Sequence, residues 1–205
     1  EAWIITVISA VAGTLLLALY FNWLTGVIAF VSLLLYGFAY TPMKKIHPIA
    51  TFIGAIPGAM PPLIGWAAAT GSISGDANIG GWILFAIQFF WQFPHFWAIA
   101  WIAHKDYSNA GFKLMPSVQG PTRYSAIQGI IYSLILIPVG MLPYLADMSG
   151  VVSFWIVLAA NLFMVIQCVR LYTDMNTKAA RRVMFSSYIY LPIVLLALLG
   201  DKNIG

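Results

Sequence analysis

The chain contains 205 residues, of which 61% are hydrophobic and only 8% are charged, and its mean hydropathy is +0.89. So little polar surface excludes an ordinary water-soluble domain and predicts an integral protein of the lipid bilayer. The net charge of +4 would suit an anionic partner, but the basic residues are confined to a few loops, so we do not expect nucleic acid as a partner.

Seven apolar runs of about 18 to 22 residues follow one another, the length that a helix needs to cross roughly 30 Å of hydrocarbon. Apolar and polar residues do not alternate within them, which excludes a transmembrane β-barrel. The expected spans are residues 3–20, 23–40, 49–70, 81–103, 125–145, 150–170 and 183–200. No linker divides them, so residues 1–205 are predicted to form one domain of the all-α class, a polytopic transmembrane helical bundle.

Positive charge is distributed unequally between the two ends of the predicted bundle. Nine of the ten Lys and Arg residues follow the second, fourth and sixth spans, whereas Lys202 alone belongs to the opposite end. This asymmetry is typical of the positive-inside rule. It predicts that the basic loops and Glu1 lie on the cytoplasmic or matrix side of the membrane.

The third span contains an unusual cluster of glycine and proline between residues 54 and 62. Pro57, Pro61 and Pro62 remove backbone donors, and the glycines permit close helix approach. We expect a broken helix here that lines a cavity, although a kink that serves packing alone would give the same pattern.

Two of the basic loops carry groups suited to a diphosphate at the membrane edge. Lys44 and Lys45 follow Tyr40, and the loop after the fourth span holds Lys105, Asp106 and Tyr107. Ammonium groups bind phosphate as point charges, and a carboxylate beside them suits Mg²⁺ that is held jointly with phosphate oxygens.

The fourth span places polar side chains in a run of aromatic residues at positions 91–97, Trp-Gln-Phe-Pro-His-Phe-Trp. Polar groups at membrane depth are functional candidates by default. Its aromatic faces suit a large flat ligand or a developing carbocation, and packing alone competes with both interpretations. His95 is equally compatible with haem iron ligation, with proton transfer and with a hydrogen bond to a neighbouring helix.

Four separated motifs, in this order, resemble the UbiA-type intramembrane prenyltransferases, and in particular their protoheme IX farnesyltransferase (haem O synthase) branch. The motifs occupy residues 40–45, 54–66, 91–96 and 106–111, and the resemblance continues through residues 172–192. It implies a nine-helix enzyme that joins farnesyl diphosphate to a vinyl group of haem b and so makes haem O. It also implies a bacterial plasma membrane or mitochondrial inner membrane, and a haem A synthase as a downstream partner.

The resemblance assigns roles to individual residues of this chain. Lys44 and Lys45 would bind and activate the diphosphate, assisted by Lys105 and Tyr40, and Asp106 would reach Mg²⁺. His95 would act on haem as an iron ligand or a proton-transfer group. The residues expected beside it at the haem are Trp91, Gln92 and Phe96.

The chain departs from the family pattern in its acidic residues. The family carries an Asn/Asp-rich motif after its second helix that supplies most Mg²⁺ ligands, and before Asp76 the only acid here is Glu1. We therefore expect this chain to lack the first two helices of the family, and to be catalytically incomplete without them.

Three other functions remain open at this stage. A quinone-precursor prenyltransferase would differ only in its acceptor, and a non-catalytic haem-binding protein would need His95 but not the lysines. A transporter would more often show repeat symmetry and charges on several helices.

Overall fold

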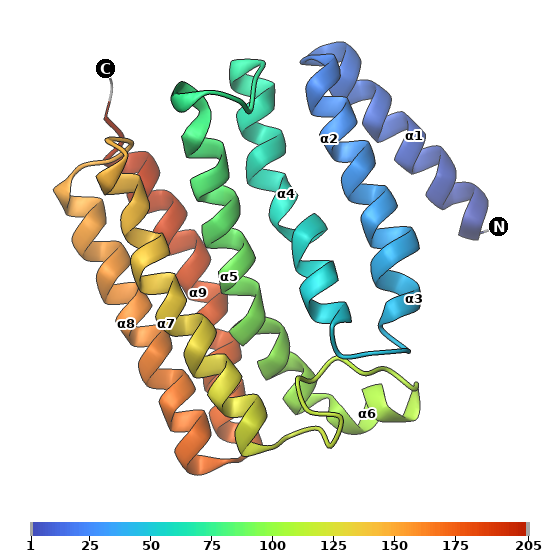
Figure 1. The fold of residues 1–205 in the computed structure, drawn as a ribbon, viewed down its shortest axis with the longest axis vertical. Coiled ribbons are helices and arrows are strands. Elements are labelled where there is room, and N and C mark those ends of the chain that lie inside the picture. Colours follow the sequence, from blue (N-terminus) through green and yellow to red (C-terminus); the bar gives the residue numbers. More distant parts are fainter. Residues whose placement is uncertain (1, 204–205) are drawn as a thin grey trace.

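The computed structural model describes residues 2–203 and has seven helices long and apolar enough to cross a membrane (Figure 1). The first is α1 (Ala2–Tyr20). The second begins as α2 (Trp23–Leu34), passes through a π-helical turn (Leu35–Tyr40) and ends as the short helix α3 (Thr41–Met43). The others are α4 (Ala50–Thr70), α5 (Ile79–Ile102), α7 (Arg123–Leu145), α8 (Val151–Asp174) and α9 (Thr177–Gly200). Within residues 2–203 no strand forms, which confirms the predicted all-α bundle.

Hydropathy located all seven spans, and its largest error is the start of the last one. Helix α9 begins at Thr177 rather than at residue 183, because the Asn176 side chain accepts a hydrogen bond from Ala179 N at 2.9 Å. This cap starts the helix ahead of the hydrophobic run. The basic residues Lys178, Arg181 and Arg182 therefore lie on the first turns of a helix and not in a loop.

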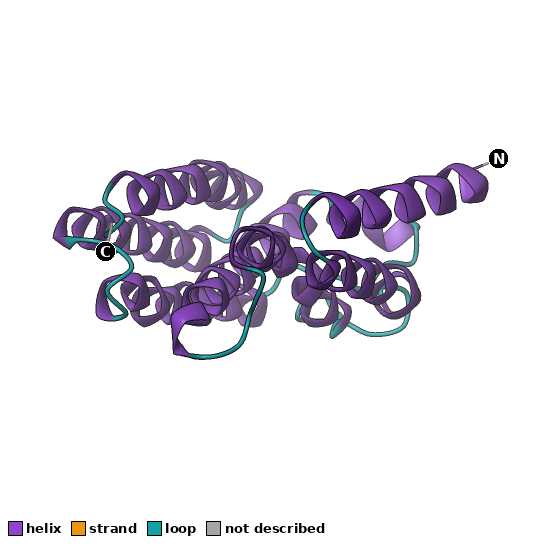
Figure 2. Cartoon of the chain, turned by 90° about the horizontal axis from the view of Figure 1, so that it is seen from above, coloured by secondary structure: helices purple, strands orange, loops and turns teal. Residues whose placement is uncertain are grey.

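Helix α5 occupies the centre of the bundle, where it packs against α4 on one side and α7 and α9 on another. Its buried residues run along its whole length, from Gly80 to Trp101. Helix α1 packs on α2 at the edge of the molecule, and the view from above shows the two termini at opposite ends of an elongated bundle (Figure 2). Residues near the middle of α5 consequently contact both halves of the chain.

The connections that carry or adjoin the basic residues other than Lys202 share one end of the bundle, here called the basic end: residues 44–49, 103–122 and 175–176. In Figure 1 this end carries α3 and the short helix α6 (His104–Asn109), and the C-terminus lies at the other end. Lys202 belongs to that opposite end, where Gly150 N donates to the Asp201 carbonyl at 2.8 Å. The predicted separation of charge between the two ends is present in the fold.

The predicted break in the third span is wrong, since α4 runs without interruption through its three prolines. Pro61 has no N–H to donate to the carbonyl of Pro57, four residues earlier. That carbonyl accepts a hydrogen bond from the Ser32 hydroxyl of α2 at 3.2 Å instead. A neighbouring helix satisfies the freed group, as it must within hydrocarbon.

Candidate active site

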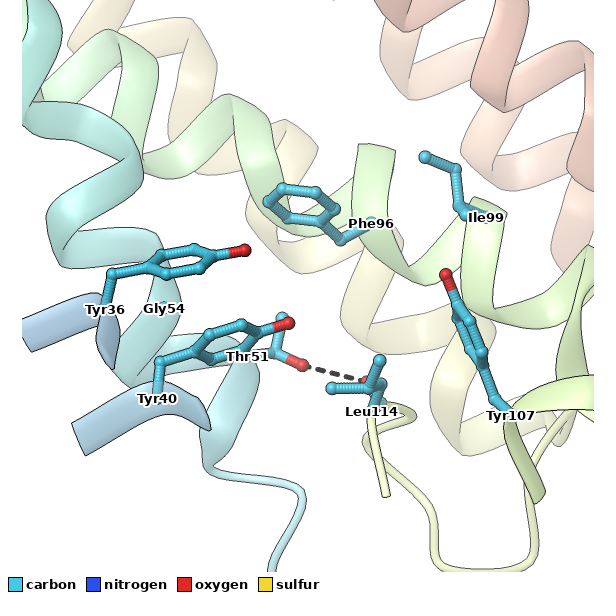
Figure 3. A pocket seen from close by; sticks show the side chains of 8 residues that line it. All are labelled: Tyr36, Tyr40, Thr51, Gly54, Phe96, Ile99, Tyr107 and Leu114. Carbon is cyan, nitrogen blue, oxygen red and sulfur yellow. Dashed lines mark hydrogen bonds between the residues drawn. The ribbon is translucent and has the colours of Figure 1, made fainter. Parts of the chain in front are cut away.

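A small cavity of about 130 Å³ opens at the basic end, between the π-helical turn, α4 and α5 (Figure 3). Tyr36 and Tyr40 enter it from one side, and Tyr107 of α6 enters from the other. Its remaining lining residues are Thr51, Gly54, Phe96, Ile99 and Leu114. The cavity is therefore apolar in its walls and bordered by three phenols.

Two tyrosines of the π-helical turn, Tyr36 and Tyr40, reach the same cavity. Tyr36 and Tyr40 are four residues apart with ring centroids 5.0 Å from each other, and Figure 3 shows both hydroxyl groups pointing the same way, into the cavity. Turns of π-helix occur often at functional sites. Tyr40 was predicted as a site residue, whereas Tyr36 was missed, although the spacing of four would have placed both on one helix face.

Helix α4 contributes a glycine, Gly54, and a polar residue, Thr51, to the cavity wall. A Cβ atom at Gly54 would lie 2.6 Å from Cδ2 of Tyr40, so the phenol ring occupies the space that a larger residue would fill. One turn earlier, the Thr51 hydroxyl donates to the carbonyl of Leu114 at 2.9 Å. This bond attaches the loop after α6 to the cavity wall.

The predicted diphosphate lysines lie beside the cavity, where two of the basic loops meet. Lys113 N donates to the carbonyl of Lys44 at 2.7 Å, which holds residues 110–115 against the turn after α3. The ammonium group of Lys44 lies 4.8 Å from the centre of the Phe112 ring and 5.8 Å from that of Tyr40. The structure thus brings Tyr40 and Lys44 together, and adds Phe112 and Lys113 to them.

Lys105 and Asp106, the other charged residues predicted at this end, are exposed on α6. Within residues 2–203, neither forms an ion pair or a side-chain hydrogen bond, and the same residues contain no group of three or more His, Cys, Asp or Glu side chains fit for a metal. Mg²⁺ commonly takes one or two carboxylates together with substrate phosphates and water. Asp106 fits a Mg²⁺ of that kind, but not a metal held by protein ligands alone.

His95 is buried at the interface of α5 and α9, with 7% of its surface exposed. Its Nδ1 lies 2.7 Å from the hydroxyl of Ser187, and its ring stacks on Trp91 at 4.7 Å. The indole N–H of Trp91 donates to the carbonyl of the same Ser187 at 3.0 Å. His95 is therefore bonded to a neighbouring helix, one of the three roles that the sequence left open.

Gln92 and Phe96 lie on a different face of α5, the one that meets α4. The amide of Gln92, 2% exposed, donates to the carbonyl of Ala55 at 3.1 Å, and Phe96 lines the cavity. Neither His95 nor Trp91 lines it. The four predicted haem contacts thus divide into two pairs with a spacing of four residues, one toward α9 and one toward α4.

Residues 1–190 match the sequence profile of the UbiA prenyltransferase family. This chain belongs to that family, so the predicted family is confirmed. Among curated relatives it is similar to the "Protoheme IX farnesyltransferase" of Cytophaga hutchinsonii (45% identity over 98% of this chain and 69% of the relative) and of Koribacter versatilis (40% over 98% and 66%). The mitochondrial protein of that name from Arabidopsis thaliana is 36% identical over 94% of this chain and 44% of the relative.

The chain spans about two thirds of the length of the two bacterial relatives. No solved structure matches it. The relatives therefore define the branch of the family to which this chain is similar.

The fit of Tyr40 against Gly54 gives a direct test of the cavity. We expect Gly54→Ala to displace the phenol and to lower the rate of prenyl transfer about tenfold, because small misplacements of active-site groups are costly. Gly65→Ala is the matched control, since a Cβ at this position of the same helix would meet no atom within 4 Å apart from its own stretch of helix. The measurement is the initial rate of prenyl transfer in Gly54→Ala and in Gly65→Ala. Equal rates in the two variants would show that the position of Tyr40 is not critical.

Proposed function

We propose that this protein transfers the farnesyl group of farnesyl diphosphate to a vinyl group of haem b and so produces haem O. The observation that carries the proposal is an apolar cavity bordered by three phenols at the basic end, with Lys44 beside the Tyr40 ring and Lys45 beside Phe112. Membership of a prenyltransferase family and similarity to relatives named protoheme IX farnesyltransferase support it.

The lysines would drive the first step, in which the bond between C1 of the farnesyl group and oxygen breaks and diphosphate leaves with the bonding electrons. Negative charge grows on the leaving group, and ammonium groups placed in advance stabilise that charge. Lys44 and Lys45 are suited to this, because neither has a carboxylate partner within residues 2–203. Mg²⁺, held by the diphosphate and Asp106, would supply further positive charge at the same oxygens.

The aromatic walls would protect the allylic cation that remains. Tyr36, Tyr40 and Phe96 line the cavity, and aromatic faces attract cations while excluding water. The electrons of the haem vinyl group then form the new carbon–carbon bond to C1. Water adds to the cation left on the vinyl group and loses a proton, which gives the hydroxyl group of the product.

The acceptor, haem b, would approach along the aromatic face of α5. It would contact the two pairs of α5 residues described above. In this proposal Phe96 and Gln92 serve the side toward α4, and His95 and Trp91 serve the side toward α9. The seven apolar helices support a reaction in a membrane, and the positive charge of the basic end favours the cytoplasmic or matrix side for it. The product would pass to a haem A synthase.

The proposal is tested by incubating the purified protein, with the expected upstream helices restored, with haem b, farnesyl diphosphate and Mg²⁺. We expect mass spectrometry to detect a haem that carries a hydroxyethylfarnesyl group, and its formation to depend on Mg²⁺. Prenylation of an aromatic acid in place of haem would assign the protein to the quinone branch. Haem binding without any transfer would indicate a non-catalytic haem protein.

The role of the lysines is tested by the double substitution Lys44→Ala with Lys45→Ala. We expect prenyl transfer to fall at least a hundredfold, because the leaving diphosphate loses both preplaced charges, whereas haem binding stays within about twofold. Transfer rates and a haem titration of the same preparation provide the two measurements. Lys202→Ala, which removes one lysine charge at the opposite end, is the control, and equal loss of transfer and haem binding in the double variant would contradict the assignment.

The role of His95 is tested by comparing His95→Ala with His95→Asn. An asparagine amide can replace the hydrogen bond to Ser187 but can neither ligate iron nor transfer a proton. We expect both variants to lower transfer to haem at least tenfold while the affinity for farnesyl diphosphate is unchanged. A normal rate in His95→Asn would show that His95 serves only the contact between α5 and α9.

A further inference from the structure

Phe112 is the residue on which the two predicted diphosphate lysines meet. Its ring centre lies 4.8 Å from the ammonium nitrogen of Lys44 and 5.9 Å from that of Lys45. Both distances are within the range at which the negative face of an aromatic ring attracts a cation. One side chain therefore contacts two neighbouring like charges, which would otherwise repel each other.

Lys44 is also held from a second direction. Its ammonium nitrogen lies 5.8 Å from the ring centre of Tyr40, so the group stands between a ring from the end of the second span and a ring from the loop after α6. Within residues 2–203, the only ion pair joins Arg182 and Asp174, so no carboxylate neutralises either lysine. Aromatic rings take the place that acidic side chains occupy in an ordinary salt bridge.

Backbone hydrogen bonds hold the loop that carries Phe112 against the lysine turn. Phe112 N donates to the carbonyl of Tyr107 at 2.8 Å, and the next amide, Lys113 N, donates to the carbonyl of Lys44 at 2.7 Å. The ring also meets the edge of the Tyr107 ring, with 6.1 Å between centres. Phe112 thus connects the lysine turn with one of the three phenols of the cavity.

We propose that Phe112 is a positioning residue that keeps both ammonium groups close together and ready for an anionic ligand. A lysine side chain has many rotamers in solution, and fixing it before binding lowers the entropic cost of binding. A carboxylate would also fix the lysines, but it would compete with the diphosphate for them. An aromatic ring attracts the ammonium groups without adding negative charge, so the diphosphate meets unneutralised cations.

This inference rests on the proposed diphosphate-dependent function and adds a residue to it. Phe112 does not take part in bond breaking, so its loss should weaken diphosphate binding and raise KM for farnesyl diphosphate. The affinity for haem should not change, and kcat should change little. A purely structural role would instead lower stability and affect every ligand.

The test compares Phe112→Leu and Phe112→Met, which remove the ring, with Phe112→Tyr, which keeps it. Phe38→Leu is the matched control, because Phe38 is exposed on the second span and lies outside the cavity. Titration calorimetry with inorganic diphosphate and Mg²⁺ measures Kd in the full chain, and transfer kinetics measure KM and kcat. We expect both ringless variants to raise Kd and KM about fivefold, equivalent to about 1 kcal/mol, and Phe112→Tyr and Phe38→Leu to match the wild type.

The outcomes separate this inference from the proposed function. Wild-type affinity for diphosphate in Phe112→Leu and Phe112→Met would overturn the role of Phe112 while normal haem farnesylation leaves the function intact. Equal weakening in Phe112→Tyr would also overturn it, because the ring would then not be the cause. A wild-type protein that binds diphosphate but farnesylates no haem would contradict the proposed function. Weaker diphosphate binding in the two ringless variants would then still support the positioning role of Phe112.

Discussion

Inside hydrocarbon, a polar group without a partner carries a cost of about 2 kcal/mol or more, and the fold depends on meeting that constraint at α5. The amide of Gln92 bonds to the backbone of α4, and the indole of Trp91 bonds to the backbone of α9. The two residues are adjacent in α5, and their hydrogen bonds reach helices on different sides of it. They fix the rotation of α5 about its own axis and therefore decide that Phe96, one turn later, faces the cavity.

The basic end has a different electrostatic character from the rest of the bundle. Lys44 and Lys45 are kept near the cavity by rings and backbone bonds, and within residues 2–203 no acid pairs with them. Unpaired cations beside an apolar cavity attract an anion that approaches it. A leaving diphosphate is the kind of anion for which this arrangement is suited.

The sequence predicted the seven spans because length and apolar content suffice to define them, and it predicted the basic end because charge asymmetry needs no three-dimensional information. It missed the beginning of α9, where charged residues hide a capped helix, and the continuity of α4. At Pro61 the carbonyl that is left free is satisfied by Ser32, which lies on another helix. Such compensation between helices leaves no signal in the segment that contains the prolines.

The candidate site was predicted unevenly for a related reason. Motifs identified Tyr40, Lys44 and the run around His95, but they could not show which of these residues share a surface. The spacing of four residues already separates Trp91 and His95 from Gln92 and Phe96, yet only the packing of α5 assigns the first pair to α9 and the second to α4. The role of Phe112 could not be predicted from the sequence, because only the folded chain brings this loop residue close to the lysines.

Two glycines on one face of α4 connect the cavity to the centre of the bundle. Gly54 receives the ring of Tyr40, and Gly58, one turn further along, receives the amide of Gln92. A rotation or slide of α4 would bring its Cβ atoms into both of these side chains at once. The same helix surface therefore positions a cavity phenol and the polar contact that orients α5, so the cavity geometry and the packing of the central helix cannot change independently.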